Sequence, residues 1–597
     1  MNKKLLLTAF TFFVLLTAAF PIFAQDTVTT NLPKIDMSAW LYNADDDVYY
    51  QLGISYCENP ADEAYENLAV FVPGPYFTGL DNGDGTWTCA VNSEAQIGEF
   101  SPASAPIVMP INTPGYSAMA PLTNYSSFTA FTGEGFLYVH AGCRGRNHGA
   151  PAGVTDLKAA IRYIRYNADI LPGDSAAVFT FGMSGGGAQS ALMGASGNSN
   201  LYAPYLEAIG AVQGVSDSIL GAMCWCPITN LDSADEAYEW MMGITRSGLS
   251  DEEQSTSDQL AAAFAAYVNN AGFRDPDGNL LTLEASSDGI YQAGSYYGYM
   301  IEVIERSLSN FLSDTIFPYE ATSSQGGPGR MGQGRMRPDR ASGGGMPAGQ
   351  RPEGMEGGQM PDFGNMGEPP QNEGEVNFEA IDDITRNSVT SALDLSGTYE
   401  TRQDYIDAMN ANGEWVSYDS VTKEVTVTSV ADFVKAFKNA SKNLGAFDQL
   451  DGGQGENTLF GYGDGKGAHF DAVLADILTN INSGYAADYA ADLARTDALG
   501  NTVDYRLDMY TPLYYLLESE AGYGSSTVAK YWRIRTGIAQ SDCALSTEVN
   551  LALALENNPN VDSVDFETIW AAGHTQAERT GTSEANFIDW VKSVVVQ

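Results

Sequence analysis

Residues 176–195 read AAVFTFGMSGGGAQSALMGA, a strand pattern that runs directly into a helix pattern. The mainly apolar start is typical of a buried strand, and the small residues after Gly185 are typical of a helix that packs closely on a sheet. Between them, Gly182-Met183-Ser184-Gly185-Gly186 fits the pattern G-x-S-x-G. In this setting the motif holds its serine in a sharp, strained turn with an accessible hydroxyl. The stretch therefore predicts Ser184 as a nucleophile.

Strand and helix patterns also alternate around this stretch. NLAVFVPGPYF (67–77) and GFLYVHAG (135–142) predict two earlier strands, and VTDLKAAIRYIRYNADI (154–170) predicts a helix with Thr155 as its N-cap. Such alternation predicts an α/β core, a mostly parallel sheet with helices on both faces.

The alternation stops in the middle of the chain and returns near the end. YWRIRT (531–536) and 564–570 predict strands, 545–556 a helix, and a last helix begins near Glu584 with Ser583 as its N-cap. The middle holds mainly helical patterns and predicts a large cap inserted into the core. Its Gly-, Met-, Pro- and Arg-rich part has too few aliphatic residues to pack and predicts a disordered loop. The expected organisation is a signal peptide at 1–24, core at 25–231, cap at 232–503 with the loop at 325–374, and core at 504–597.

The first residues predict export. Lys3 and Lys4 precede an apolar run, and Ala24 is a small residue at a plausible cleavage point, so we expect a secreted or periplasmic protein. No later stretch predicts a membrane span. A formal charge of −45 argues against attraction to nucleic acid or anionic lipid.

A nucleophilic serine needs a base, and histidine usually fills that role. In the predicted fold the chain order is serine, acid, histidine, so His140 and His148 come too early. His469 lies in a Gly-rich part of the cap, whereas His574 follows a core strand and is the predicted base. Asp542, in the loop after the preceding core strand, is the predicted acid.

Acyl transfer also needs backbone donors for the oxyanion. Gly185 N–H, directly after the nucleophile, is one predicted donor. The second should come from the loop after 67–77, where Pro75 has no N–H; of Gly74 and Tyr76 we favour Tyr76. The loop HAGCRGR (140–146) is expected to shape the pocket instead.

Several segments together resemble the bacterial tannases, which are tannin acyl hydrolases with an α/β-hydrolase core and a large cap, related to feruloyl esterases and carboxylesterases. The resemblance implies a serine esterase of phenolic, above all galloyl, esters that acts through an acyl-enzyme, with Ser184, Asp542 and His574 as its triad. The segments are VFVPGPYF (70–77), GFLYVHAGCRGR (135–146), TDLKAAIRYIRYNADILPGD (155–174), FGMSGGGAQSALMGA (181–195), RIRTGIAQSDCALSTEVNLALAL (533–555) and IWAAGHTQAER (569–579).

One departure from the family concerns the grip on the galloyl hydroxyls. Tannases use a Lys and a Glu of the cap and an Asp two positions past the catalytic Asp. With Asp542 as the acid, that position holds Ala544, whereas Lys466 is a candidate for the Lys and the Glu is not placed. The missing carboxylate predicts a weaker preference for gallate and leaves feruloyl or simple carboxylic esters as alternatives.

Two other classes compete with an esterase: a serine peptidase on the same core and a binding module without catalysis. The expected partner is a small aromatic ester, with no protein partner inferred. No metal or organic cofactor is implied, since DNGDGT (81–86) fits a turn better than a calcium loop. Among six cysteines, Cys57 and Cys89 are a plausible disulfide pair in an exported chain.

Overall fold

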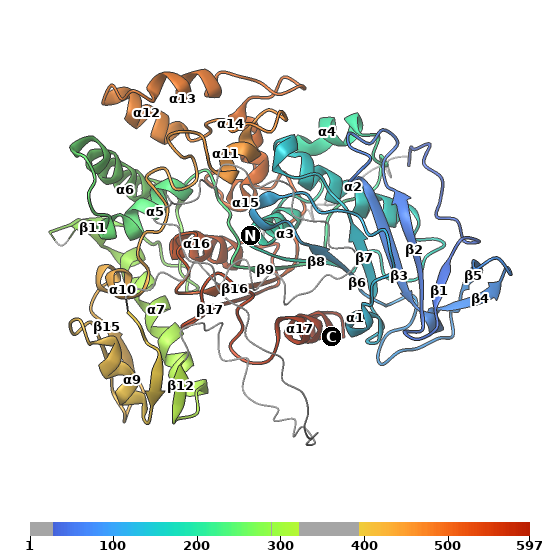
Figure 1. The fold of residues 1–597 in the computed structure, drawn as a ribbon, viewed down its shortest axis with the longest axis horizontal. Coiled ribbons are helices and arrows are strands. Elements are labelled where there is room, and N and C mark those ends of the chain that lie inside the picture. Colours follow the sequence, from blue (N-terminus) through green and yellow to red (C-terminus); the bar gives the residue numbers. More distant parts are fainter. Residues whose placement is uncertain (1–27, 288, 322–392, 597) are drawn as a thin grey trace, which may run out of the picture.

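A computed structural model describes residues 28–287, 289–321 and 393–596 of the chain. The predicted signal peptide and the predicted loop at 325–374 lie outside these described residues. The described chain forms a sheet-centred core with a large insertion beside it (Figure 1). No helix within it is long and apolar enough to cross a membrane.

A nine-stranded sheet forms the centre of the core. From β7 to β17 neighbouring strands run parallel, whereas the edge from β1 to β7 is antiparallel. The strands, in spatial order, are β1 (Leu41–Asn43), β2 (Val48–Ser55), β3 (Asn67–Pro73), β7 (Leu137–Ala141), β6 (Ile107–Ile111), β8 (Val178–Met183), β9 (Gly221–Trp225), β16 (Tyr531–Gly537) and β17 (Ser563–Ile569). A hairpin of β4 (Phe77–Asp81) and β5 (Trp87–Val91) lies apart from this sheet.

Helices cover both faces of the sheet, which confirms the predicted α/β-hydrolase fold class. On one face, Ser190 of α3 hydrogen-bonds Thr180 of β8 at 2.8 Å. On the other, Phe587 of α17 packs on Phe181 of β8, with ring centroids 4.5 Å apart. The core helices are α1 (Thr129–Thr132), α2 (Ala152–Tyr166), α3 (Gly185–Ala195), α4 (Ala203–Ala208), α16 (Leu545–Glu556) and α17 (Ser583–Val595).

The insertion joins β9 to β16, and its described part is mainly helical, with three two-stranded antiparallel sheets. Its α5 and α15 pack on α16, and α15 also packs on α3, so the insertion lies against the helices beside the carboxyl ends of the parallel strands. Its elements among the described residues are α5 (Ala234–Met242), α6 (Asp251–Ala271), β10 (Glu284–Ser286), β11 (Gly289–Ala293), α7 (Ser295–Asp314), β12 (Tyr319–Ala321), β13 (Gly397–Tyr399), α9 (Arg402–Met409), β14 (Val416–Tyr418), β15 (Val425–Val427), α10 (Val430–Phe437), α11 (Gly455–Phe460), α12 (Ala472–Asn480), α13 (Ala486–Leu493), α14 (Val503–Tyr510) and α15 (Pro512–Leu516).

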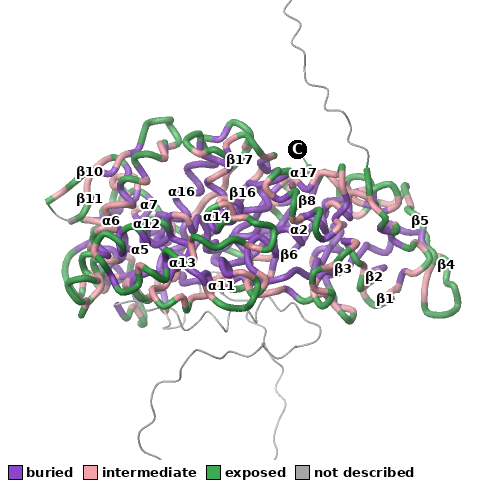
Figure 2. The backbone as a smooth tube through the Cα atoms, turned by 90° about the horizontal axis from the view of Figure 1, so that it is seen from above, coloured by how far each residue is buried: buried purple, intermediate pink, exposed green. Residues whose placement is uncertain are grey.

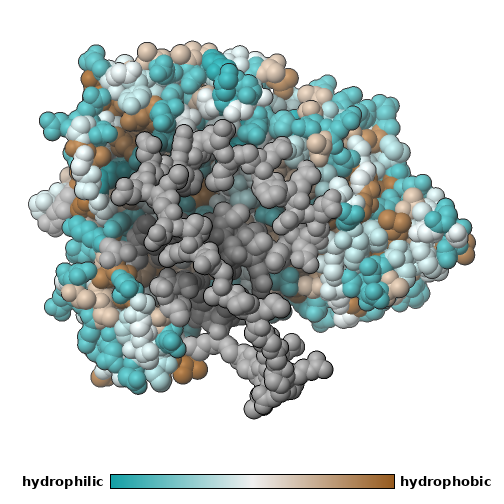
Figure 3. Space-filling model, in the orientation of Figure 1, coloured by the Kyte–Doolittle hydropathy of each residue, from teal (hydrophilic) through white to brown (hydrophobic). Residues whose placement is uncertain are grey.

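Burial follows this architecture. Figure 2 shows the buried backbone concentrated in the central strands and their covering helices, with exposed residues at the loops and the outer helices. Hydrophilic residues make up much of the described surface seen in Figure 3, as the large negative charge requires. All six cysteines are buried and free, so the suggested pairing of Cys57 with Cys89 is wrong.

Some local predictions differ from the structure. Strand β6 was not expected because Pro110 interrupts IVMPI, and proline disfavours an inner strand. Helix α2 begins at Ala152, so Thr155 is inside its first turn and donates to Pro151 O instead of capping the helix. The N-cap of α17 is Thr582, whose side chain accepts from Ala585 N, and not the neighbouring Ser583.

Candidate active site

Ser184 lies between β8 and α3 in a strained backbone conformation, with φ 59° and ψ −124°. Its N–H donates to Trp225 O at 3.0 Å, at the end of the next strand. The turn needs glycine beside it: a Cβ on Gly186 would lie 2.0 Å from Ile111 O. The backbone therefore has the geometry of a nucleophile elbow, and Ser184 is partly exposed.

The loop after β6 lies against this elbow. A Cβ on Gly185 would be 2.5 Å from Tyr116 N and 3.3 Å from Gly115 N, so only glycine fits there. Tyr116 N–H is already used, since it donates to Thr113 O at 2.9 Å. The N–H groups of Gly185 and Gly115 have no hydrogen-bond partner within the described part of the chain. These two groups are therefore the candidate donors for an oxyanion.

Tyr76 cannot take that role, which corrects the sequence prediction. It follows β3, which runs antiparallel to β7 and therefore ends at the opposite edge of the sheet from Ser184. Its side chain is buried there and donates to Phe100 O and Gly135 O, both at 3.0 Å. The error arose because the unrecognised strand β6, and not β3, is the neighbour of β8 whose loop reaches the elbow.

His574 lies in the loop after β17 and is 4% exposed. Cys226, which directly follows the Trp225 that binds the elbow, contacts the carbonyl oxygens on both sides of this histidine. Its Sγ lies 4.0 Å from Gly573 O and 3.2 Å from Thr575 O. Residues 225 and 226 thus join the Ser184 turn to the His574 loop. Burial lowers the pKa of His574, Asp542 raises it, and Lys442 and Lys438 lower it further.

The partner of His574 differs from the predicted acid. Nδ1 of His574 lies 2.8 Å from Oε1 of Gln540, whereas Oδ2 of Asp542 is 3.8 Å away and has no hydrogen-bond partner among the described residues. The structure therefore places a neutral amide where the sequence predicted Asp542 as the acid. Sequence reasoning missed Gln540 because a carboxylate is the usual partner of the base and Asp542 was near at hand.

Gln540 itself belongs to a buried hydrogen-bond network. Its Nε2 donates to Glu548 Oε1, and the same oxygen accepts from Thr536 Oγ1 at 2.9 Å and from Cys543 Sγ at 3.1 Å. The backbone carbonyl of Gln540 accepts from the buried Lys438 amine. Glu548 comes from the first turns of α16, directly after the loop that carries Gln540.

The two predicted substrate-binding residues are not at this site. The Lys466 side chain is 82% exposed and pairs with Asp464 at 3.7 Å. Ala544 is fully buried at the N-cap of α16. Position in a Gly-rich loop suggested Lys466, and a count of two residues from Asp542 suggested Ala544.

Two other ionisable residues of the insertion lie near the elbow. Lys442 is close enough to His574 to lower its pKa, and its amine lies 3.9 Å from the centroid of the Phe447 ring. Glu456 is 8% exposed at the start of α11, which packs against the Gly115 loop. Burial, followed by the charge of Glu456, raises the pKa of Tyr116.

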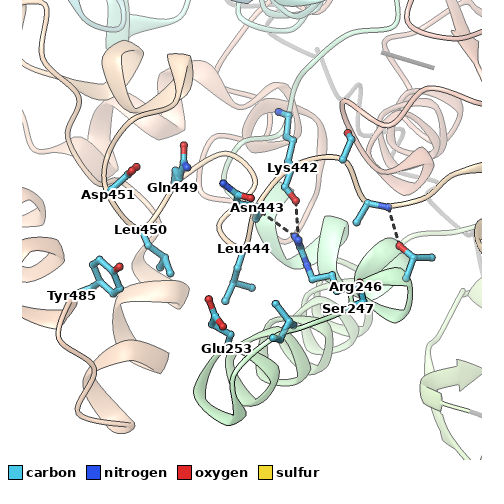
Figure 4. A pocket seen from close by; sticks show the side chains of 14 residues that line it. Arg246, Ser247, Glu253, Lys442, Asn443, Leu444, Gln449, Leu450, Asp451 and Tyr485 are labelled. Carbon is cyan, nitrogen blue, oxygen red and sulfur yellow. Dashed lines mark hydrogen bonds between the residues drawn. The ribbon is translucent and has the colours of Figure 1, made fainter. Parts of the chain in front are cut away.

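A polar groove of about 570 Å³ is lined in part by the loop that carries Lys442. Arg246 anchors that loop from α5's side, since it donates to Lys442 O at 2.7 Å and to Asn443 O at 3.0 Å. Figure 4 shows the Lys442 side chain extending away from Arg246, on the side opposite Leu444.

His469, the other histidine considered as a base, is held within the insertion by a hydrogen bond and a ring stack. Its Nδ1 hydrogen-bonds Asp448 Oδ1 at 2.7 Å, and its ring stacks on Tyr489 with centroids 3.7 Å apart. Asp448 also accepts from the backbone N–H groups of Phe470 and Asp471. Within the described ranges, no cluster of three or more His, Cys, Asp or Glu side chains could hold a metal ion.

Comparisons with known proteins give consistent results. The family model BD-FAE, which is feruloyl esterase-like, matches residues 105–265. The structure is similar to a tannase from Fusobacterium nucleatum at 25% identity, covering 96% of this chain and 99% of that one, with a TM-score of 0.62. It is also similar to a tannin acyl hydrolase from Lactobacillus plantarum at 26% identity, covering 92% and 94%, with a TM-score of 0.61. A comparison with curated proteins gives no match. These likenesses confirm the resemblance that the sequence predicted.

Proposed function

We propose that this tannase-like α/β-hydrolase, a carboxylic ester hydrolase at the level of its family, is a serine esterase of galloyl and related hydroxybenzoyl esters. The observation that carries the proposal is that the Ser184 turn and the His574 loop are both bound by the adjacent residues Trp225 and Cys226. One of these adjacent residues binds the backbone of Ser184, and the other binds the loop of His574.

The reaction follows from these groups. As His574 Nε2 takes the proton of Ser184 Oγ, the oxygen attacks the ester carbonyl carbon. The N–H groups of Gly185 and Gly115 would bind the resulting oxyanion. The intermediate collapses, the C–O bond to the alcohol breaks, and the alcohol leaves with the proton from His574. Water then attacks the acyl-enzyme with the same base, which releases the acid and restores the serine.

The hydrogen bond at Nδ1 supports this role for His574. Because an amide oxygen can only accept, His574 must carry its proton on Nδ1, which leaves Nε2 unprotonated. Nε2 is then the ring nitrogen that can take the serine proton. Burial lowers the pKa of His574 and favours this neutral form.

The substrate class is inferred from the charged residues around the elbow. If Gln540 occupies the place of the family's acid, the position two residues further on is Asp542, a carboxylate, and no longer Ala544. Lys442 and Glu456 then supply the cap Lys and Glu that the resemblance implies. Adjacent phenolic hydroxyls would find an amine and two carboxylates as partners. Among the similar structures is a tannin acyl hydrolase in complex with ethyl gallate.

Feruloyl ester hydrolysis is the second candidate, and the match to BD-FAE over residues 105–265 favours it. That segment contains the elbow and the Gly115 loop but none of Lys442, Glu456 and Asp542. The match thus bears on ester chemistry and says less about recognition of the acyl group.

A substrate panel tests the proposal: methyl gallate, methyl ferulate, methyl benzoate and p-nitrophenyl butyrate, compared by kcat/KM. We expect methyl gallate to exceed methyl benzoate by at least about 10-fold, since each unpaired buried polar group costs about 1–3 kcal/mol. A fluorophosphonate should label Ser184 alone, and Ser184→Ala should lower kcat by about 10⁵–10⁶. Label on another serine, or turnover kept by Ser184→Ala, would refute the nucleophile.

Export is a further proposal that rests on the sequence alone. The charged start and apolar run before Ala24 are typical of a cleaved secretory signal. N-terminal sequencing of the protein purified from the periplasm or medium should begin at Gln25. A protein retained in the cytoplasm with Met1 intact would contradict it.

A further inference from the structure

An amide beside a catalytic histidine creates a difficulty that a carboxylate does not. A carboxylate can only accept a hydrogen bond from Nδ1, whereas an amide can present its NH₂ group and hold the proton on Nε2 instead. In a serine protease whose triad acid is replaced by an amide, kcat falls about 10⁴-fold because the wrong tautomer is held. Gln540 must therefore be prevented from turning its amide over.

Glu548 supplies the constraint. Its Oε1 accepts a hydrogen bond from Gln540 Nε2, which leaves Oε1 of Gln540 pointing at His574 Nδ1, 2.8 Å away. In the reversed orientation, the amide oxygen would face the carboxylate oxygen of Glu548, and two acceptors would oppose each other without water. Both residues are buried, Gln540 at 1% and Glu548 at 0% exposure, so solvent cannot relieve that repulsion.

We propose that Glu548 is a positioning residue that acts through Gln540 to fix the Nδ1–H tautomer of His574, so that the negative charge of the triad lies one hydrogen bond further from the base than usual. The proposal rests on the assignment of His574 as the base of the esterase. Gln540 orients the ring directly, and Glu548 determines which end of the Gln540 amide does so.

Hydrogen bonds and a nearby cation oppose the effect of burial, which raises the pKa of Glu548. Three donors converge on Oε1: Gln540 Nε2, Thr536 Oγ1 and Cys543 Sγ. Lys438, at the end of α10, is the nearby cation, and its field lowers the pKa of Glu548 against the larger effect of burial, which raises it. The thiols of Cys543 and Cys226 are neutral, since burial raises the pKa of each.

Asp542 is the competing source of negative charge. Its Oδ2 lies 3.8 Å from His574 Nδ1, too far for a hydrogen bond, and its side chain is 32% exposed. A rotation of this side chain could replace Gln540 as the partner of Nδ1. The two arrangements predict different effects of Glu548→Gln. Glu548 influences His574 only where Gln540, and not Asp542, is the partner of Nδ1.

The first test reads the tautomer without using activity. The protein has four histidines, so ¹⁵N-labelled histidine gives a spectrum that His574→Gln can assign. We expect His574 to carry its proton on Nδ1 in the wild type and to show a mixed or Nε2–H form in Glu548→Gln. An unchanged Nδ1–H signal in that variant would overturn the proposal.

The second test exchanges the two groups. Glu548→Gln should lower kcat for p-nitrophenyl butyrate by about 10²–10⁴ with little change in KM, as a wrong tautomer does. The double variant Gln540→Glu/Glu548→Gln places a carboxylate on His574 and an amide donor behind it in the same space. We expect it to recover kcat to within about 10-fold of the wild type. Loss in the single variant without recovery in the double one would mean that Glu548 is merely structural.

Glu556→Gln is the matched control, because it makes the same change at the exposed far end of the same helix, α16. It should leave kcat and the His574 spectrum unchanged. A kcat for Glu548→Gln within about 3-fold of the wild type, combined with a large loss in Asp542→Asn, would assign the role to Asp542. If Ser184→Ala keeps its activity, the proposed function fails, but the tautomer measurement remains valid.

Discussion

Arg146 donates a hydrogen bond from Nη1 to the carbonyl oxygen of Gly115 at 2.9 Å. The guanidinium thus holds the loop that carries the second candidate oxyanion donor. The same Nη1 would lie 2.5 Å from a Cβ on Gly455, at the start of α11 of the insertion. Arg146 therefore stands between the cap and the Gly115 loop, which gives HAGCRGR a more definite role than the pocket wall expected from the sequence.

Removal of this contact should weaken catalysis more than binding. Deletion of an oxyanion donor costs about 10²–10³ in kcat, and a loosened donor should cost less. We therefore expect Arg146→Ala to lower kcat for p-nitrophenyl butyrate about 10-fold with KM little changed. Arg274→Ala is the control, since this arginine is exposed and its side chain donates to Gly278 O in its own turn. A rise in KM at constant kcat would mean that Arg146 binds substrate instead.

The sequence was sufficient for the elbow because its signal is local. A strand pattern, G-x-S-x-G and a run of small residues occur within 176–195, and the strained φ of Ser184 follows from that spacing. The periodic pattern of apolar residues likewise predicted the helix at 545–556 and the loop that carries His574. The neighbour of β8 was not, because Pro110 hides β6 and strand order is a long-range property.

The partner of His574 shows why residue type alone was insufficient. Gln540 and Asp542 occur in the same loop, and only the turn after β16 determines which side chain reaches Nδ1. From residue type alone, an aspartate is the natural candidate for the partner of the base. Glu548, one helix turn into α16, is an acid on an apolar helix face, and this signal was available in the sequence. A glutamate is rarely buried without a partner.

The assignment of the base predicts opposite outcomes for two histidines. His574→Ala should lower kcat nearly as much as Ser184→Ala, because the serine hydroxyl then has no proton acceptor. His469→Ala removes a ring that bonds Asp448 and stacks on Tyr489 in the insertion, so it should lower the melting temperature while kcat changes little. Loss of turnover in His469→Ala with normal stability would contradict the assignment.

Asp542 is expected to select the substrate. If Asp542 accepts hydrogen bonds from phenolic hydroxyls, it should raise kcat/KM for gallate esters. It should affect benzoate esters little, because benzoate has no hydroxyl group. We expect Asp542→Asn to lower kcat/KM for methyl gallate at least about 10-fold, which corresponds to about 1.4 kcal/mol, and to leave methyl benzoate within about 3-fold. Glu456→Gln should show the same pattern. An equal loss with both esters would mean that Asp542 serves the base and not the substrate.

Burial of His574 predicts the acid side of the pH profile. Since burial lowers its pKa from 6.5, the imidazole stays neutral as pH falls through 6.5, and kcat/KM for p-nitrophenyl butyrate should decline only below that value. Protonation of Glu548 as the pH falls would also reduce kcat/KM. In Gln540→Glu/Glu548→Gln, the carboxylate on Nδ1 favours the imidazolium and raises the pKa of His574. The acid limb of the double variant should therefore lie at higher pH; a limb at lower pH would contradict this reasoning.

Glu578 is expected to stabilise both the fold and the loop of His574. Its carboxylate accepts from Arg533 Nη1 and Nη2, both at 2.6 Å, and from Trp225 Nε1 at 2.9 Å. Glu578 and Arg533 are buried, so Glu578→Ala leaves the Arg533 guanidinium in the core with only its 3.4 Å ion pair to the more exposed Asp565. Removal of one partner of a buried ion pair costs about 3–5 kcal/mol. We expect a lower melting temperature and, because Trp225 also binds the backbone of Ser184, a lower kcat at temperatures where the variant is folded. Lys530→Ala, which breaks the exposed pair with Asp562, should lower the free energy of unfolding much less, because solvent screens that pair. Chemical unfolding of both variants measures the difference, and equal losses would show that burial does not strengthen the dependence on Glu578.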